Sequence, residues 1–250
     1  MLKPYENGGI AMASKPIMQF KAELMDAHIP IWRRFQVMND VRFSRLAYIL
    51  MSMFEMQGGH LFAFHVDVAA NAGRQATDDF TAARIAKEYN DAGFGDIEFQ
   101  MPIAAGWIAD AQEEMGITVK DATREYVKWH VTHIGDEFYF EYDFGDGWEV
   151  KLTLEDVFED KELHGRNLPR VIEGEGYGII EDCGGTGGLE HLDEVFKRGS
   201  GSEYEELREW LGEDELDLTE FDINIVNELL KTDPAILKDS YESDIERAGS

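Results

Sequence analysis

The chain has 250 residues, of which 44% are apolar, and a formal net charge of −28. This is enough apolar material for one large folded domain or two small ones. No stretch approaches the roughly 18–20 uninterrupted apolar residues of a membrane span, and residues 1–15 lack the apolar core of a secretory signal peptide. Cys183 is the only cysteine, so no intrachain disulfide can form. We therefore expect a soluble, cytoplasmic protein.

The negative charge is concentrated in the second half of the chain. Residues 136–250 carry ten basic and thirty-four acidic side chains, a net charge of −24. Such a surface repels nucleic acids and anionic membranes, because phosphate binding needs lysine and arginine. Direct nucleic-acid binding is therefore not expected from this half. Two interpretations remain open: the charge keeps the protein soluble, or it forms a docking surface for a basic protein partner.

The first part of the sequence predicts a flexible arm, three strands and a helix. Residues 1–14 show no hydrophobic period, which is typical of a loose arm. Alternating apolar residues predict strands, at residues 18–24, 31–37 and 60–67. Apolar residues at helical spacing predict a helix over 41–56, capped by Asp40.

The middle of the sequence, residues 66–135, gives weaker signals and is interpreted as a divergent, insertion-like region. Short patterns there predict a helix over 81–90, a strand over 96–101 and a second helix over 121–130.

A β-hairpin around Gly145-Asp146-Gly147 is the clearest structural prediction. Apolar and polar residues alternate over 137–144, with the apolar positions at Phe138, Phe140, Tyr142 and Phe144. The alternation resumes at Trp148. Two alternating runs around a glycine-rich turn are typical of a hairpin.

The last part of the sequence predicts three helices and a charged, mobile tail over 233–250. The helices are expected over residues 189–197, over 203–211 and after Asp222. Early strands, a late hairpin and helices between and after them indicate an α+β fold with a mixed or antiparallel sheet packed by several helices. We expect one such domain over 15–232.

Four segments have a distinctive composition. They are Pro30-Ile31-Trp32-Arg33-Arg34, then Gly59-His60-Leu61, then Tyr142-Asp143-Phe144-Gly145-Asp146-Gly147-Trp148-Glu149, then Glu181-Asp182-Cys183-Gly184-Gly185. Their order and spacing over roughly residues 15–232 resemble the plasmid pRiA-type open-reading-frame-three-like family, whose members are often labelled TnpR-like. The resemblance implies an α+β fold, an origin in bacteria or mobile elements, and no established activity.

The sequence departs from that family at two positions where it often has histidines, because Phe62 and Val150 stand there. The TnpR-like label implies a resolvase, which is a serine recombinase, and the sequence fits that activity poorly. A serine recombinase needs an arginine cluster and a basic DNA-binding segment, and a net charge of −28 opposes both.

Four carboxylates in the two acidic segments would form one site if the 181–188 loop folds over the hairpin turn. They are Asp143, Asp146, Glu181 and Asp182. Clustered carboxylates suit a hard divalent cation such as Mg²⁺ or Ca²⁺, and two such ions would support phosphoester hydrolysis. The alternative is that these groups accept hydrogen bonds from turn and helix-start amides. No catalytic residue is assigned, and no cofactor other than such a cation is expected.

The remaining candidates have simpler structural interpretations. His60 and His65 are five residues apart on a predicted strand, and therefore on opposite faces, so they are poor co-ligands. The acidic surroundings of Cys183 would raise its thiol pKa and oppose a nucleophilic role. The segment from Gly184 to Gly188 lacks a following Lys-Ser or Lys-Thr, so it is not a P-loop but a tight turn into a helix.

Arg33 and Arg34 lie on opposite faces of their predicted strand. We expect one of them to pair with a carboxylate from the acidic half and to tie the two parts of the chain together.

Three functions are compatible with these observations. The first is an acidic accessory or regulatory protein that binds a partner and has no catalytic activity. The second is a metal-dependent phosphohydrolase that uses the carboxylate cluster. The third is a decoy that mimics nucleic acid and occupies a DNA-binding protein, which requires carboxylates at phosphate-like spacing on an exposed face.

Overall fold

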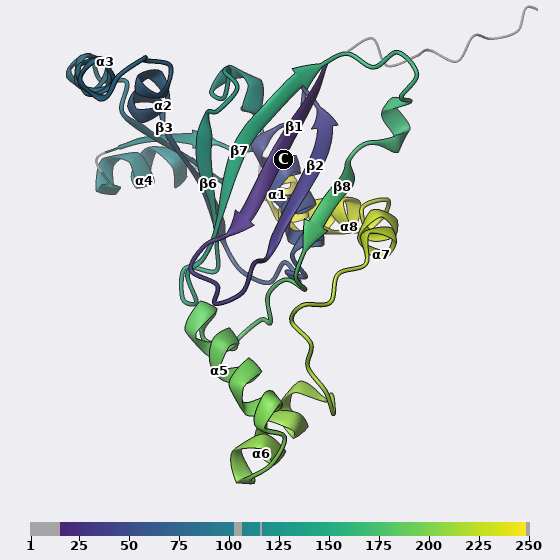
Figure 1. Cartoon of the computed structure of the whole chain (residues 1–250). Coiled ribbons are helices and arrows are strands. Elements are labelled where there is room, and N and C mark those ends of the chain that lie inside the picture. Colours follow the sequence, from purple (N-terminus) through teal and green to yellow (C-terminus); the bar gives the residue numbers. More distant parts are fainter. Residues whose placement is uncertain (1–15, 103–106, 116, 249–250) are drawn as a thin grey trace, which may run out of the picture.

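The computed structural model, shown in Figure 1, describes residues 16–102, 107–115 and 117–248, so the arm expected over 1–14 lies outside them. Its centre is an eight-stranded sheet in the order β5-β4-β3-β6-β7-β1-β2-β8. Neighbouring strands are antiparallel except β4 and β5, which are parallel. The strands are β1 (Ile17–Leu24), β2 (Trp32–Met38), β3 (Phe62–Asp67), β4 (Asp96–Gln100), β5 (Thr118–Asp121), β6 (Glu137–Tyr142), β7 (Trp148–Phe158) and β8 (Arg170–Glu175).

The helices are distributed unevenly around this sheet. They are α1 (Phe43–Met53), α2 (Val68–Arg74), α3 (Asp79–Asp91), α4 (Trp107–Met115), α5 (Gly185–Arg198), α6 (Ser202–Leu211), α7 (Ile223–Leu229) and α8 (Asp233–Ala248). In Figure 1, α1 and α8 lie behind the sheet and α2–α4 lie beside the β3–β5 edge. Helices α5 and α6 form an arm, residues 185–211, that projects from the lower end of the sheet. The predicted α+β fold with a mixed sheet and several helices is confirmed.

One face of the sheet packs on α1 and forms the hydrophobic core. Almost every residue of α1 is buried, so this helix is apolar on nearly all sides. Phe43 stacks on Phe99 of β4 with ring centroids 3.8 Å apart, and its ring meets Phe138 of β6 edge-on. The predicted hairpin is confirmed, with Tyr142 opposite Trp148, although Phe144 lies in the turn and is half exposed.

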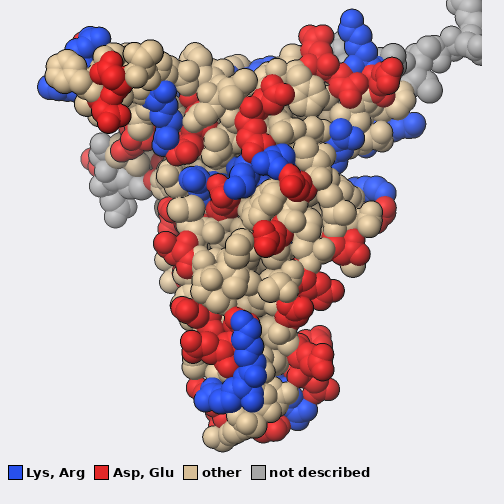
Figure 2. All heavy atoms as spheres, in the orientation of Figure 1, with Lys and Arg blue, Asp and Glu red and all other residues tan. Residues whose placement is uncertain are grey.

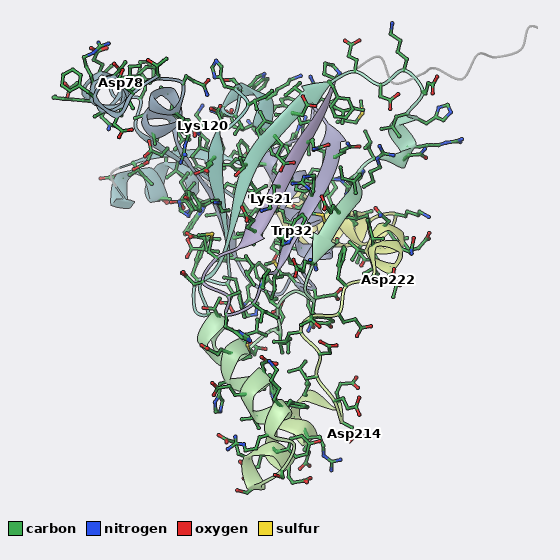
Figure 3. The ribbon with its side chains drawn as sticks, in the orientation of Figure 1. Lys21, Trp32, Asp78, Lys120, Asp214 and Asp222 are labelled. Carbon is green, nitrogen blue, oxygen red and sulfur yellow. The ribbon has the colours of Figure 1, made fainter. Side chains whose placement is uncertain are left out.

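The other face of the sheet is polar and carries Lys21 and Trp32, both labelled in Figure 3. Arg34 points to this face and donates to Glu155 (Nε to Oε2, 2.6 Å) and to Glu173. The expected pairing of one of the two arginines with the acidic half of the chain is therefore confirmed. Within the described ranges, no helix is long and apolar enough to cross a membrane.

The neighbouring Arg33 points the opposite way and is fully buried. Its guanidinium donates to the carbonyl oxygens of Met53, Trp32, Glu175 and Tyr177, at 2.6 to 3.1 Å. It also lies over the rings of Phe54 and Phe221. Burial lowers the pKa of Arg33 to about 10, while the charge of Glu55 opposes this shift. A group with that pKa is still protonated at neutral pH, so a positive charge is held in the core by carbonyl dipoles and aromatic faces.

Three sequence predictions are corrected by the structure. The helix expected over 121–130 is replaced by the end of β5 and the short 3₁₀ turn Val127–Trp129, because the Asp121 carboxylate accepts hydrogen bonds from the backbone and hydroxyl of Thr123 and ends the regular pattern. Helix α1 is shorter than predicted and begins after Arg42 rather than after Asp40. The tail expected to be mobile after residue 232 forms α8, which packs on α1 through its buried Leu237.

We predict that Arg33→Met destabilises the fold by about 3–5 kcal/mol, because four carbonyl groups lose their donor in a buried site. Arg33→Lys also loses most of this stability, since a single ammonium cannot reproduce the planar fork. Urea unfolding of the variants measures both effects. The matched control is Arg34→Met on the open face, which costs about 1 kcal/mol or less. Equal losses for the two methionine variants would contradict this role for Arg33.

Candidate metal centre

Three segments that are distant in sequence meet at one end of the sheet. β3 and β6 pair in antiparallel register, with Phe62 opposite Tyr142. The residues just before β3 therefore lie beside those just after β6, and the Asp143 amide donates to the Leu61 carbonyl oxygen at 3.0 Å. The loop between β8 and α5 closes over the same end and brings Glu181 and Asp182 to this position.

His60 lies at the centre of the acidic groups. Its Nδ1 is 3.5 Å from Asp143 Oδ2, and its Nε2 is 3.0 Å from Glu181 Oε2 and 3.8 Å from Asp182 Oδ1. One ligand atom from each of His60, Asp143 and Asp182 lies within 4.8 Å of the other two. We call these three residues the His60 centre. Its side chains range from partly buried to exposed, so solvent can reach it.

Glu181 is the most firmly held of the four predicted carboxylates. Its Oε1 accepts a hydrogen bond from the Tyr142 hydroxyl at 2.7 Å and another from the backbone amide of Gln57 at 2.7 Å. The Tyr142 oxygen in turn accepts from the amides of Gly58 and Gly59. Burial raises the pKa of Tyr142, and the Glu181 carboxylate adds to the shift, so this hydroxyl stays protonated and keeps donating.

Asp146 has a different role, because its Oδ2 accepts from the Gly184 amide at 3.2 Å and so binds the loop to the hairpin turn. Gly185 and Gly188 must be glycines because neighbouring backbone carbonyl groups approach their Cα atoms closely. A Cβ on Gly185 would lie 2.4 Å from the Asp146 carbonyl oxygen, and one on Gly188 would lie 1.7 Å from the Cys183 carbonyl oxygen. The segment Gly184–Gly188 was predicted to be a tight turn before a helix over 189–197, but α5 already begins at Gly185, so most of this segment forms the first turn of the helix.

Two of the proposed ligands have unusual backbone conformations. Asp143 and Asp182 both have positive φ angles, near 55° and 60°. Aspartate tolerates this region better than most residues, yet it still costs free energy, and such positions cluster at functional sites. The backbone thus turns both carboxylates toward His60 at some cost in strain.

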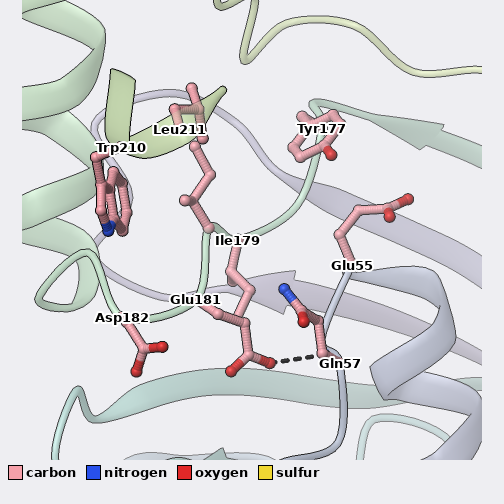
Figure 4. A pocket seen from close by; sticks show the side chains of 9 residues that line it. Glu55, Gln57, Tyr177, Ile179, Glu181, Asp182, Trp210 and Leu211 are labelled. Atoms are coloured by element: carbon pink, nitrogen blue, oxygen red, sulfur yellow. Dashed lines mark hydrogen bonds between the residues drawn. The ribbon is translucent and has the colours of Figure 1, made fainter. Parts of the chain in front are cut away.

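A cavity of about 400 Å³ opens beside the His60 centre. Glu181 and Asp182 form one wall, and Tyr177, Trp210 and Glu55 lie around the rest, as Figure 4 shows. A second cavity of about 250 Å³ lies between α5 and α6 and shares Asp182 and Trp210 with the first. Asp182 therefore faces both spaces, and a ligand in either one can reach it.

Cys183 lies beside these groups, but its thiol is unreactive. Burial raises the pKa of its thiol to about 12, and the charge of Asp146 adds to the shift. A thiol with that pKa is almost entirely protonated at neutral pH and is a poor nucleophile.

The sequence predicted part of this site and missed its centre. Asp143, Glu181 and Asp182 converge, while Asp146 serves the backbone. His60 was set aside because it was assigned to a strand, whereas β3 begins at Phe62 and the His60 side chain is free to turn toward the acidic loop. The signal that was available is the pair Gly58-Gly59 immediately before it, which marks a turn rather than a strand.

Other residues of the distinctive segments, and several near them, have structural roles in this region. Trp148 is buried in the core at the start of β7, and Gly145 donates its amide to Asp143 Oδ1 within the turn. Phe62 and Val150 are also buried, in the core of the sheet. His65 pairs with Glu98 and Glu141, away from His60.

Comparison with known proteins identifies a family, a relative in sequence and a solved structure with a similar fold. The family model described as plasmid pRiA4b ORF-3-like protein matches residues 16–227. A relative from Sinorhizobium fredii, the uncharacterized protein y4hQ, is 26% identical over 202 residues, which cover 80% of this chain and 84% of the relative. A crystal structure of a protein of unknown function from Methanosarcina mazei Go1 has a TM-score of 0.63 at 22% identity, covers 84% of this chain and 96% of its own, and shows the same fold.

We predict opposite effects for alanine at two neighbouring glycines of α5. Gly188→Ala destabilises the protein by about 1–3 kcal/mol, because its Cβ meets the Cys183 carbonyl. Gly187→Ala stabilises it by about 0.5–1 kcal/mol, since nothing lies within 4 Å of the new Cβ and alanine favours a helix. Thermal unfolding of both variants measures the difference. If Gly188→Ala unfolds at the wild-type temperature or above it, the loop does not close on α5 as described.

Proposed function

We propose that this protein, which belongs to the family of plasmid pRiA4b ORF-3-like proteins, binds a divalent transition-metal ion at the His60 centre. The observation that carries the proposal is the convergence of one imidazole and two carboxylates, His60, Asp143 and Asp182, within 4.8 Å. They come from three separate parts of the chain, so the fold itself brings them together.

The donor set favours a particular class of metal ion. Carboxylates alone suit Mg²⁺ and Ca²⁺, but an imidazole nitrogen shifts the preference toward Zn²⁺, Mn²⁺ or Co²⁺. Three protein ligands leave coordination positions for water or for a ligand in the adjoining cavity, which is typical of reactive rather than purely structural zinc sites.

Glu181 supports the proposal as an orienting group. Metal-binding histidines commonly direct their second nitrogen to a carboxylate, which fixes the ring and raises its basicity. Glu181 Oε2 is 3.0 Å from His60 Nε2, and its other oxygen is held by Tyr142 and Gln57. In this arrangement the Nδ1 that faces Asp143 is the nitrogen available to the ion.

Metal-dependent hydrolysis is the activity that such a centre would support. A bound ion lowers the pKa of its water toward neutrality and stabilises developing negative charge on a substrate oxygen. The cavity of about 400 Å³ beside Asp182 is large enough for a small substrate. The strained backbone at Asp143 and Asp182 is consistent with a site shaped for chemistry rather than for stability alone.

Binding is tested by thermal unfolding with Zn²⁺, Mn²⁺, Co²⁺, Mg²⁺ and Ca²⁺. At a hundredfold excess over the dissociation constant, an ion adds about 2.7 kcal/mol, which for a chain of this size raises the midpoint by about 5–10 °C. We expect this rise with a transition metal in the wild type, and its loss in His60→Gln and Asp182→Asn.

The matched control is Asp146→Asn, which removes a carboxylate of the same region that binds only backbone. This variant keeps the metal-induced rise. The proposal is wrong if no ion shifts the wild-type midpoint, or if His60→Gln responds as strongly as the wild type.

A second candidate function is that of an accessory protein whose acidic arm binds a basic protein partner. The arm, α5 and α6, projects away from the sheet (Figure 1), and acidic side chains line its edges in Figure 2. Trp210 is about half exposed on α6, and an exposed aromatic beside carboxylates suits a lysine- or arginine-rich segment. Lys197, Arg198 and Arg208 interrupt the acidic surface, and each has a carboxylate partner on the arm. This argues against a phosphate-like row of charges and so against a nucleic-acid decoy.

This second candidate predicts that charge reversal on the arm matters more than charge reversal elsewhere. We expect Glu206→Lys combined with Glu209→Lys to weaken binding of a labelled lysine- and arginine-rich peptide at physiological salt by at least about tenfold. Fluorescence anisotropy measures the affinity. The control is Glu159→Lys combined with Glu162→Lys, which makes the same charge change away from the arm. Equal weakening by both pairs would show nonspecific attraction to an acidic protein.

A further inference from the structure

A cavity of about 700 Å³ lies at the β8 edge of the molecule, away from the His60 centre. Its walls come from α1, from the segment that leads into β8, and from the end of α7. Four basic side chains line it: Arg45, Arg166, Arg170 and Lys231. Among the residues that the structure describes, no carboxylate lines it.

This charge distribution is unusual for the chain. The protein carries 51 acidic and 23 basic residues, so a random surface cavity would contain more carboxylates than basic groups. Here four of the 23 basic residues gather around one space. Basic groups around a concave, partly apolar surface raise the local positive electrostatic potential and attract anions.

None of the three arginines that line the cavity forms an ion pair with the side chains that the structure describes. Arg45 on α1 is partly buried, and burial lowers its pKa; Tyr48 and Glu242 act on it electrostatically but form no ion pair with it. Arg166 lies in the 3₁₀ turn Gly165–Asn167 and is exposed. Burial outweighs the effect of Glu242 on the Arg45 pKa, so a bound anion would recover part of the free energy that burying this guanidinium costs.

The other two basic groups are already oriented by neighbours. Arg170 donates through Nε to Gln36 Oε1 at 2.9 Å, which leaves its terminal nitrogens available. Lys231 follows α7, contacts Glu228 of that helix at 2.5 Å and is mostly exposed. The cavity is therefore lined by three arginines and one lysine, of which only the lysine forms an ion pair with a described carboxylate.

The walls of the cavity are held in place by Asn227. Its side chain accepts from the Val171 amide at 2.9 Å and donates to the Val171 and Ile223 carbonyl oxygens. These bonds join α7 to β8, so the spacing between Lys231 and Arg170 is fixed. A site whose supporting elements are locked binds with a smaller entropy cost.

The rest of the lining is apolar and includes Leu168, Ile172, Ile223 and Leu230. A ligand that fits must therefore combine a compact anionic group with an uncharged organic part. Guanidinium groups match phosphate oxygens in a bidentate geometry, and a volume of this size is typical of sites for small organic molecules.

We propose that this cavity is a binding site for a small organic phosphomonoester, with Arg45 and Arg166 on the phosphate and the Ile223–Leu230 wall against the organic part. The site is separate from the His60 centre, and its occupation does not depend on metal binding there. A nucleic acid polymer is not the ligand, because the acidic surface around the cavity repels an extended chain of phosphates.

Isothermal titration calorimetry tests the proposal with five probes: adenosine 5′-monophosphate, glucose 6-phosphate, inorganic phosphate, adenosine and glucose. We expect at least one phosphomonoester to bind at least about tenfold more tightly than inorganic phosphate, and we expect no binding of the uncharged compounds. If neither phosphomonoester binds, or if inorganic phosphate binds as tightly as both, the proposed ligand class is wrong.

The location is tested with the double variant Arg45→Gln and Arg166→Gln, which should weaken phosphomonoester binding by at least about tenfold, since each charge-assisted contact contributes on that scale. The control is the double variant Arg84→Gln and Arg124→Gln, which changes the net charge equally at two exposed positions elsewhere and should leave the affinity within about twofold. Equal weakening by the two double variants would overturn the assignment. Thermal melts of all three proteins, the wild type and the two double variants, confirm that the comparison is made on folded chains.

Discussion

The buried guanidinium of Arg33 is the interaction on which the arrangement of this molecule depends. It joins the end of α1, the neighbouring strands β2 and β8, and the start of the loop that leads to Glu181, through the carbonyl oxygens of Met53, Glu175 and Tyr177. A buried charge has lost its water, so hydrogen bonds to surrounding dipoles must offset the cost of removing it from solvent. Those carbonyl groups belong to three elements, so the hydrogen bonds of one side chain fix the relative positions of all three. The loop that carries Glu181 and Asp182 follows directly from one of them, and its position depends on the same contacts.

The sequence predicted the parts of this fold that have a period. The hairpin over β6 and β7, the strands β1 to β3 and the helices α5 to α7 follow from alternating or helical apolar spacing. Edge strand β8 was missed because Arg170, Glu173 and Glu175 mark it as polar, and an edge strand needs no apolar alternation. Helix α8 was missed because its apolar face rests on few residues, chiefly Leu237 and Tyr241, within a charged segment.

The candidate site was predictable in composition but not in geometry. Two segments rich in aspartate and glycine identified the acidic loop and the hairpin turn, and their convergence followed from a loop fold that no local pattern determines. His60 joined them for a reason that only the three-dimensional structure reveals: β3 starts two residues later than the alternation suggests. The four basic residues of the β8-edge cavity come from α1, a 3₁₀ turn, β8 and the residues after α7, so no sequence window contains them together.

The contact of α8 with the His60 centre has a consequence for how the protein is made. Tyr241 donates its hydroxyl hydrogen to the His60 carbonyl oxygen, and its ring packs against Phe62 and stacks on Tyr48. Gly58 leaves room for Leu237, since a Cβ there would lie 2.3 Å from Cδ2 of that leucine. During synthesis from the N-terminus, residues 233–241 leave the ribosome after every ligand of the centre. The histidine is therefore held in its final position only once this late segment has docked, which delays assembly of the site until the rest of the fold is in place.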